Sequence, residues 1–355
     1  MKFHWLLPSF ITLISLSLPA TATNPQVHPK VQQTSKQNYI ADLTPQPQNL
    51  AIPGIKFIIP IPESKPNSST INNSVDKNKS LFAGVVPLGK EMSQLKTQVQ
   101  TLMAKNYKFL APGMFFLDLE SGDYLDINGD KVFPAASTIK YPVLIALFEQ
   151  VDAGKIKLDE TLVLRSSQKA AGSGTLQYQA SGIHLSVAET VNKMISISDN
   201  TATNMIIDRL GGKEKLNQRF QNWGLQSTVI RNRLGDFKGT NTTSAKDLVR
   251  LSALIENHKL ISDTSHLQVI EIMRNCHNAK LLAAGVGKGG KIAHKTGDIG
   301  FVVGDAGIIE MPNGHRYLAG FFVRRPHDDE RGREFVRRVS RMVYEHFDHP
   351  VITQK

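Results

Sequence analysis

Segments with strand character lie at both ends of the patterned part of this chain, and helical periodicity fills the sequence between them. Near the start, residues 113–119 and 124–127 are separated by Glu120, Ser121, Gly122 and Asp123, which predicts a hairpin. Near the end, segments 291–296, 305–310 and 317–323 also have strand character. Strands from the two ends of the chain can bury their apolar faces in a common core if they join one sheet. The pattern therefore predicts one antiparallel sheet of five strands.

Helices are predicted to cover this sheet. Apolar residues recur at helical spacing from Met92 to Met103, and again on one face from Phe335 to Phe347. Between about 134 and 285 the periodicity is mostly helical. The predicted fold class is therefore α/β (α+β): a five-stranded antiparallel sheet flanked by N- and C-terminal helices, plus an all-helical subdomain, with a site between the two parts.

The first residues have the pattern of a secretory signal. Lys2 precedes an apolar stretch from Leu6 to Leu18, and Ala20, Thr21 and Ala22 form an A-x-A cleavage site. A membrane anchor is the alternative, but the stretch is interrupted by polar residues and is shorter than the roughly 20 residues of a spanning helix. We expect a signal peptide over 1–22, cleavage near Ala22, and export to the periplasm or the exterior.

Residues 23–87 are rich in Pro, Asn, Gln, Ser and Lys and carry no sustained periodicity. That composition predicts a disordered linker ahead of a folded domain over 88–355. An apolar patch between Ile52 and Ile61 is broken by prolines, which favours extended backbone there.

Charge and cysteine content limit the partners. The net charge of +11 suits contact with an anionic cell-envelope polymer, and a basic surface without a partner explains it equally well. Export argues against nucleic acid. Cys276 is the single cysteine, so no internal disulfide forms, and we expect it to be a small buried thiol. We expect a monomer.

The pattern S-x-x-K occurs four times, beginning at Ser74, Ser93, Ser137 and Ser166, so context has to separate the four. Only Ser137 follows the strand hairpin and opens a strongly apolar helical run, from Ile139 to Val151. A serine at that helix N-terminus has free N–H groups and the positive end of the helix dipole beside it. Lys140 lies one turn later and can reach the serine oxygen.

Two further motifs supply what this pair needs. Ser198, Asp199 and Asn200 occur once in this order, and so do Lys295, Thr296 and Gly297. A lysine acts as a base only when burial or a nearby cation lowers its pKa, and a second lysine is such a cation. S-x-x-K, S-D-N and K-T-G in this order are the known signature of class A β-lactamases and penicillin-binding proteins.

The chain resembles this penicillin-recognising family of serine hydrolases beyond the three motifs. Residues 199–204 look like the family's D-N-T-A-x-N run, Gly211 with Gly212 and Thr242 with Thr243 fall where relatives have comparable residues, and the resemblance covers about 88–349. A segment Gly172-Ser173-Gly174-Thr175-Leu176 and the sequence His294-Lys295-Thr296-Gly297-Asp298 look like a separate branch.

The resemblance implies a role for each site residue. Ser137 would attack a β-lactam or a D-Ala-D-Ala amide, Lys140 would take its proton, and Ser198 would pass a proton to the leaving nitrogen. Asn200 would orient Lys140 and the substrate. The substrate carboxylate would be held by Lys295 and Thr296, beside Gly297, and the oxyanion by backbone N–H groups of Ser137 and Asp298.

Three departures from the family pattern stand out. Relatives hydrolyse the acyl-enzyme with a glutamate in an E-x-x-L-N segment, and this chain has no such segment. A tentative alignment of Leu234 with the leucine of that segment puts Arg231 at the glutamate and Gly235 at the asparagine. Asp236 is expected to be an exposed loop carboxylate without a catalytic task. Asp298 is expected to discourage anionic substrates, and no arginine occurs in 300–307, where many relatives bind the substrate carboxylate.

These observations leave three functions open. The first is a β-lactam-hydrolysing enzyme with slow deacylation, and the second is a D-Ala-D-Ala carboxypeptidase or penicillin-binding protein acting on peptidoglycan stem peptides. The third is a non-catalytic module that binds the cell envelope. No cofactor or metal is expected, because the G-x-G-x-x-G match at 285–290 precedes a strand rather than following one, and no H-E-x-x-H motif occurs.

Overall fold

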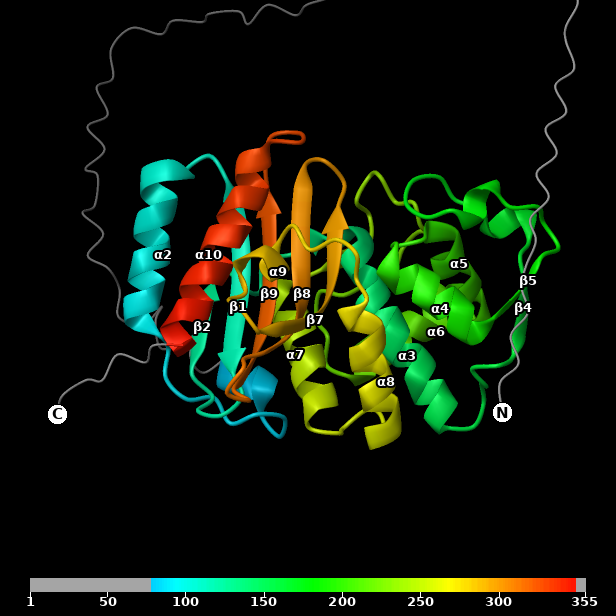
Figure 1. The fold of residues 1–355 in the computed structure, drawn as a ribbon, viewed down its shortest axis with the longest axis horizontal. Coiled ribbons are helices and arrows are strands. Elements are labelled where there is room, and N and C mark those ends of the chain that lie inside the picture. The colour runs from blue at the N-terminus through cyan, green and yellow to red at the C-terminus, as the bar shows by residue number, and fades with distance from the viewer. Residues whose placement is uncertain (1–77, 349–355) are drawn as a thin grey trace, which may run out of the picture. The chain divides into compact units, whose positions relative to one another are not determined.

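A five-stranded antiparallel sheet is the centre of the computed structural model, which describes residues 78–348 (Figure 1). The strand order is β2-β1-β9-β8-β7. The strands are β1 (Ala111–Asp118), β2 (Tyr124–Ile127), β7 (Lys291–Asp298), β8 (Val302–Glu310) and β9 (Arg316–Arg324). The N-terminal hairpin joins the C-terminal strands through β1 and β9, where Phe115 pairs with Gly320. This confirms the predicted sheet and leaves β7 at its free edge.

Two long helices cover one face of the sheet. They are α2 (Ser93–Asn106) and α10 (Glu330–Asp348), which come from opposite ends of the described region (Figure 1). Leu95 and Val99 of α2 and Phe335 of α10 are buried in the same apolar cluster, and the ring of Phe335 meets that of Phe321 on β9 edge-on. The helix α9 (Leu282–Gly285) packs against α10. Both flanking helices were predicted from the sequence.

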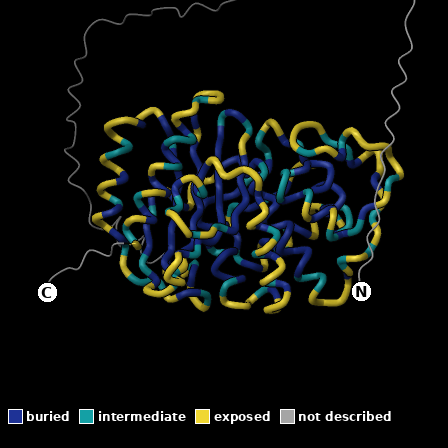
Figure 2. The backbone as a smooth tube through the Cα atoms, viewed as in Figure 1, coloured by how far each residue is buried: buried dark blue, intermediate teal, exposed yellow. Residues whose placement is uncertain are grey.

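The opposite face supports α7 (Ala245–Glu256) and packs against the helical part of the molecule. That part contains α3 (Lys140–Asp152), α4 (Val187–Ser196), α5 (Asn200–Arg209), α6 (Lys213–Asn222) and α8 (Asp263–Arg274), with short helical turns η1 (Ala136–Ile139), η2 (Ser166–Gln168) and η3 (Leu176–Tyr178). Every residue from 140 to 148 of α3 is buried, as expected for a helix with apolar residues on all sides (Figure 2).

Short strand pairs interrupt the predicted all-helical middle. β3 (Phe133–Pro134) pairs with β6 (Thr242–Thr243), and β4 (Thr161–Val163) pairs with β5 (His184–Ser186). Segments of two or three residues carry no detectable period, so the sequence pattern did not reveal them. The pair β3–β6 lies just before η1 and helps to fix the start of α3.

The folded domain begins before the predicted boundary at residue 88. Residues 78–82 are helical, and Phe82 and Val86 are buried in the main core, with the ring of Phe82 stacked on that of Phe115. The predicted linker over 23–87 is therefore wrong at its C-terminal end. The predicted signal peptide over 1–22 and the apolar patch near 52–61 lie outside the described residues. Within 78–348, no helix is both long enough and apolar enough to cross a membrane.

Candidate active site

Ser137 lies in the turn η1, which runs directly into α3. The preceding residue, Ala136, has a φ of 46°, a left-handed conformation that a residue with a Cβ seldom adopts. Hydrogen bonds hold this turn on both sides: Ala135 N donates to Asn241 O, and Thr138 Oγ1 donates to Ala135 O at 2.6 Å. The local strain is thus maintained by the surrounding structure, and the serine occupies the N-terminal end of a buried helix as predicted.

Lys140 is completely buried beneath Ser137. Its Nζ lies 3.1 Å from Ser137 Oγ, 3.0 Å from Ser198 Oγ, 2.6 Å from Ser198 O and 2.8 Å from Asn200 Oδ1. These partners are a carbonyl, an amide oxygen and two hydroxyls, and none is a carboxylate. Burial lowers the pKa of Lys140 well below its ordinary value, the charge of Lys295 lowers this pKa further, and only Asp199 opposes the change. A neutral amine that can accept a proton from Ser137 is therefore accessible.

The Ser198-Asp199-Asn200 segment begins α5 and anchors the glycine-rich loop. Asp199 caps α5 through Ala202 N, and its other oxygen accepts from Thr175 N and Leu176 N at 2.7 and 2.9 Å. A Cβ on Gly174 would lie 2.2 Å from the Asp199 carboxyl carbon, and the φ of Gly174 is +96°. The unusual Gly-Ser-Gly-Thr-Leu run is explained by this close approach, because only glycine fits at 174.

Asn200 connects the same loop to Lys140. Its Nδ2 donates to Ala171 O at 2.8 Å while its Oδ1 accepts from Lys140 Nζ. Both ends of the amide are used, which fixes its orientation. The predicted role of Asn200 in orienting Lys140 agrees with this geometry.

The K-T-G strand β7 closes the site from the other side. Lys295 is 1% exposed, its Nζ donates to Thr296 O at 2.9 Å, and burial lowers its pKa, with the charge of Asp305 acting in the opposite direction. A Cβ on Gly297 would lie 2.8 Å from Ser137 N, so this glycine lets the strand edge approach the serine backbone.

A cleft of about 380 Å³ brings the predicted residues together. Its walls include Ser137, Ser198, Lys295, Thr296, Gly297 and Asp298. Lys140 and Asn200 lie beneath them. One wall was not predicted: Cys276, His277, Asn278 and Lys280, between α8 and α9. Nothing in the local sequence of 276–280 marks it as a cleft wall, because only the fold brings it to the 196–198 segment, where His277 N donates to Ser196 O.

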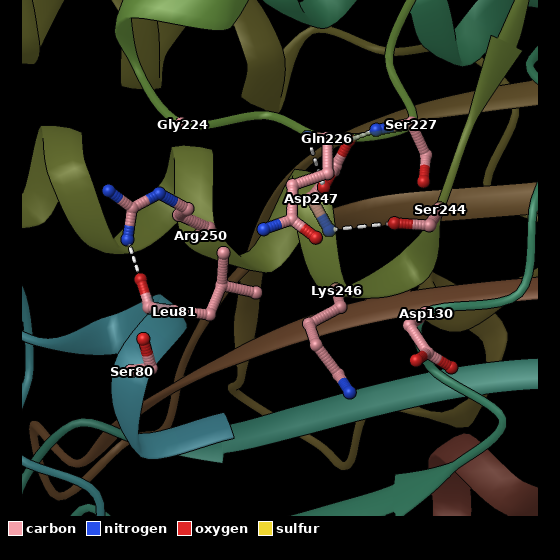
Figure 3. Close-up of a pocket in the computed structure, with 10 residues that line it drawn as sticks. All are labelled: Ser80, Leu81, Asp130, Gly224, Gln226, Ser227, Ser244, Lys246, Asp247 and Arg250. Carbon is pink, nitrogen blue, oxygen red and sulfur yellow. Dashed lines mark hydrogen bonds between the residues drawn. The ribbon is translucent and has the colours of Figure 1, made fainter. Parts of the chain in front are cut away.

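A second cavity, of about 500 Å³, lies elsewhere in the described region, and Figure 3 shows its lining. Its buried charges are already satisfied. Asp247 accepts from Ser227 N and from Thr228 Oγ1, both at 2.7 Å, and Lys246 pairs with Asp126 at 2.9 Å. Arg250 donates to backbone carbonyls of Leu81 and Trp223. The charged side chains that line this cavity therefore stabilise the fold. Neither Ser137 nor Lys140 is among its lining residues.

Asp298 does not present an uncompensated charge to the cleft. Both of its oxygens accept from Arg325 Nη2, at 2.7 and 2.9 Å, and Oδ2 also accepts from Arg333 Nη2 at 2.7 Å. The expectation that Asp298 repels anionic substrates is therefore wrong in its premise, because two arginines neutralise the carboxylate. The sequence did not reveal them, because they lie beyond β9 and in α10, outside the segment 300–307 where many relatives have an arginine.

The loop between α6 and β6 supplies no carboxylate to the cleft. Asp236 is 8% exposed and accepts from Asn241 N at 2.6 Å and from Thr240 Oγ1, so the predicted exposed carboxylate is instead a buried brace. Arg231 donates to Thr240 O and to Thr242 Oγ1, away from Ser137, so the tentative register that puts it at the glutamate has no support.

Leu234, rather than Arg231, lies next to the machinery of the site. Asn204 binds both backbone groups of Leu234, at 2.6 and 3.0 Å, and Asn204 is one helical turn beyond Asn200 on α5. The side chain at this position is apolar and buried. No group suited to activating a hydrolytic water is present there.

Comparison with known proteins gives one consistent result. Residues 94–347 match the beta-lactamase enzyme family. The extended-spectrum beta-lactamase PER-1 of Pseudomonas aeruginosa is 26% identical over 240 residues, covering 62% of this chain and 77% of that protein. The beta-lactamase VEB-1 of the same organism is 24% identical, covering 69% of this chain and 87% of its own length.

Solved structures agree with the sequence comparison. The structure of PBP-A is 51% identical to this chain, with a TM-score of 0.72, and covers 74% of this chain and 99% of PBP-A. A beta-lactamase from Sphaerobacter thermophilus is 27% identical with a TM-score of 0.65, covering 72% of this chain and 97% of its own. An L158E mutant of PBP-A, 50% identical, is described as an acyl-enzyme complex with penicillin-G.

Proposed function

Because this chain belongs to the beta-lactamase enzyme family, we propose that it opens the amide bond of β-lactams through an acyl-enzyme on Ser137. The single observation that supports this most strongly is the position of Lys140. A buried lysine without a carboxylate partner, with Nζ 3.1 Å from a serine hydroxyl at a helix N-terminus, is arranged to remove that hydroxyl proton.

Acylation then follows from the described contacts. Lys140 takes the proton of Ser137 as Oγ attacks the lactam carbonyl carbon, and the negative oxygen is stabilised by the N–H groups of Ser137 and Asp298. Ser198 Oγ, 3.0 Å from Lys140 Nζ, relays a proton to the lactam nitrogen as the C–N bond breaks. Lys295 and Thr296 hold the substrate carboxylate, and Gly297 allows the strand to lie against the serine.

Hydrolysis of the acyl-enzyme has weaker support in this chain. A general base contributes typically 10²–10⁴-fold, and neither Arg231, Leu234 nor Asp236 offers one to the cleft. We therefore expect acylation to be fast relative to deacylation. The steady rate of β-lactam hydrolysis is then set by release of the acyl group.

A second function is favoured by the same observation together with the 51% identity to PBP-A. An enzyme that acylates readily and deacylates slowly on lactams fits a D-Ala-D-Ala carboxypeptidase or penicillin-binding protein, with a peptidoglycan stem peptide as substrate. The nucleophile, base and carboxylate-binding groups are the same in both proposals. They differ in whether a peptide or a lactam acyl group is turned over.

A burst experiment with a chromogenic cephalosporin tests the proposal. A rapid phase with an amplitude of one product per active chain, followed by a slow linear phase, is expected, with one acyl adduct by intact mass. Ser137→Ala should lose both phases. Ser93→Ala is a matched control, because Ser93 begins another S-x-x-K pattern, in α2, and it should behave as wild type. Absence of any adduct on the wild-type chain would reject the acyl-enzyme.

Release of D-Ala from a muropeptide separates the two functions. Release that depends on Ser137, with only a slow linear phase on the cephalosporin, supports the peptidase. No release, together with sustained cephalosporin hydrolysis, supports the β-lactamase. Binding of peptidoglycan with neither reaction would support the non-catalytic alternative.

Export to the periplasm or the exterior is part of the proposal and is supported by the N-terminal sequence around Lys2 and Ala22. N-terminal sequencing of the protein from its native host is expected to find a mature start near Thr23. A start at Met1 in the cytoplasmic fraction would contradict export.

A further inference from the structure

The turn that follows the K-T-G strand is held by one buried arginine. Arg325, immediately after β9, has a side chain with no exposed surface. Its Nη2 donates to both oxygens of Asp298, its Nε donates to Gly300 O at 2.8 Å, and its backbone N donates to Phe301 O at 3.0 Å. Gly300 N also donates to Asp298 Oδ1 at 2.9 Å. The turn 298–301 is therefore bound to Arg325 by side chain and backbone.

The direction of the Asp298 backbone N–H follows from its place on the edge strand. β7 has β8 on one side only, and the N–H groups along a strand alternate between the two sides. Ile299 N donates to Val302 O across the turn toward β8. The N–H of Asp298 therefore points from the free edge of β7, the edge where Gly297 approaches Ser137 N.

We propose that Arg325 is a positioning residue for acylation, acting through Asp298 to fix the backbone N–H that completes the oxyanion site. This rests on the proposed acylation of Ser137. The Asp298 side chain fixes the position of its own backbone. Arg325 binds the carboxylate on the side away from the cleft, while the backbone N–H stays directed into the cleft. Arg333 adds two N–H donors to the same oxygen, Oδ2, from α10.

The energetic argument is one of alignment. An oxyanion donor is effective when it is fixed before the charge develops, and loss of one such donor costs about 10²–10³-fold in rate. The Arg325 side chain has no exposed surface and does not line the cleft, so its removal leaves the donor present and only loosens it. We therefore expect a smaller loss, of roughly 10- to 100-fold, in the first-order acylation rate at saturating lactam, with little change in the half-saturating concentration.

Arg325→Met, Asp298→Ala and the double variant test this coupling on the full chain by stopped-flow acylation. Each single change breaks the same contact, so the double variant should acylate no more slowly than the slower single variant. Arg325→Lys keeps the charge but cannot bridge Asp298 and Gly300 with a rigid fork, so its rate should lie between Arg325→Met and wild type. Additive losses in the double variant would overturn the proposal.

The readouts also distinguish positioning from misfolding. The burst amplitude counts competent chains, whereas the rate constant reports how well each competent chain acylates. A merely structural Arg325 would lower the amplitude and the thermal midpoint and leave the rate constant unchanged, which would overturn the proposal. Arg316→Met is the matched control: Arg316 begins the same strand β9, at its opposite end, and pairs with Glu256, so its rate constant should remain that of wild type.

Two results separate this proposal from the function on which it rests. If wild-type protein forms no adduct, the proposed function fails first. If wild type acylates and Asp298→Ala acylates faster or binds lactams more tightly, then the Asp298 carboxylate repels the substrate and the positioning role is wrong.

Discussion

Replacement of Lys140 by methionine should abolish acylation and, at the same time, stabilise the fold near neutral pH. The activity loss follows from removal of the only amine among residues 78–348 that hydrogen-bonds to Ser137 Oγ. A general base contributes typically 10²–10⁴-fold, which corresponds to about 2.7–5.4 kcal/mol in the activation barrier. Methionine has a similar length and no proton to exchange, so Ser137 would remain a neutral alcohol.

The stability change has the opposite sign because of the environment of Lys140. Burial lowers the pKa of this lysine, and the unfolded chain restores the ordinary value. A group with a lowered pKa in the folded state costs stability wherever it must be protonated, and that cost is fully present below its folded pKa and fades as pH rises toward the ordinary value near 10.5. Methionine removes the cost, so its stabilising effect should be larger at pH 6 than at pH 9.

Stopped-flow acylation and urea unfolding at these two pH values measure both effects. Lys246→Met is the control, because Lys246 is also buried but pairs with Asp126. That variant leaves Asp126 without its cationic partner and should lose stability while acylating normally. Refutation would come from a Lys140→Met variant that acylates within threefold of wild type, or whose stability gain is the same at both pH values.

Three further substitutions follow from the contacts of the site. Asp199→Ala removes a helix cap and two loop hydrogen bonds and should lower the free energy of unfolding in urea by about 2–4 kcal/mol. An unchanged urea midpoint would count against this prediction. Gly297→Ala brings a Cβ to 2.8 Å from Ser137 N and should slow the burst at least about tenfold, whereas a wild-type burst would show that the strand edge yields easily. Leu234→Glu puts a carboxylate beside the first turn of α5, which carries Asn200 and Asn204. The steady rate of cephalosporin hydrolysis after the burst should rise about tenfold or more, with the burst unchanged. A steady rate as slow as that of wild type would contradict this prediction.

The parts of the fold that the sequence predicted are those with a sustained period. The five strands and both flanking helices were found because alternation or helical spacing continues over several residues. The strands β3 to β6 are two or three residues long and were missed for lack of such a pattern. The domain start was placed too late because the apolar run that holds Phe82 and Val86 spans only residues 81–88, which is too short to show a period, and it follows a polar, proline-rich stretch.

The same distinction explains the site. Ser137, Ser198 and Lys295 were found because each lies in a short motif whose chemistry is readable locally, and the fold then brings them to one cleft. Arg325 and Arg333 were missed because their partner, Asp298, is 27 and 35 positions away and no local spacing links them. The prediction for Asp236 was wrong for a related reason. A carboxylate in a polar loop is expected to be exposed, and the sequence gives no sign of the hydrogen bond from Asn241 N that holds Asp236 in a buried position.

The contacts of this site favour making the acyl bond over breaking it. Several charged groups around the cleft favour the first step: burial and the charge of Lys295 lower the pKa of Lys140, Asp199 holds the loop at 174–176, and Arg325 pairs with the Asp298 carboxylate. The second step needs a carboxylate near a water, and Asp199, Asp236 and Asp298 are committed to backbone N–H groups or arginines. These groups cannot take over deacylation without giving up the hydrogen bonds and ion pairs that they hold. A long-lived acyl-enzyme is thus the expected result of how the charges are distributed.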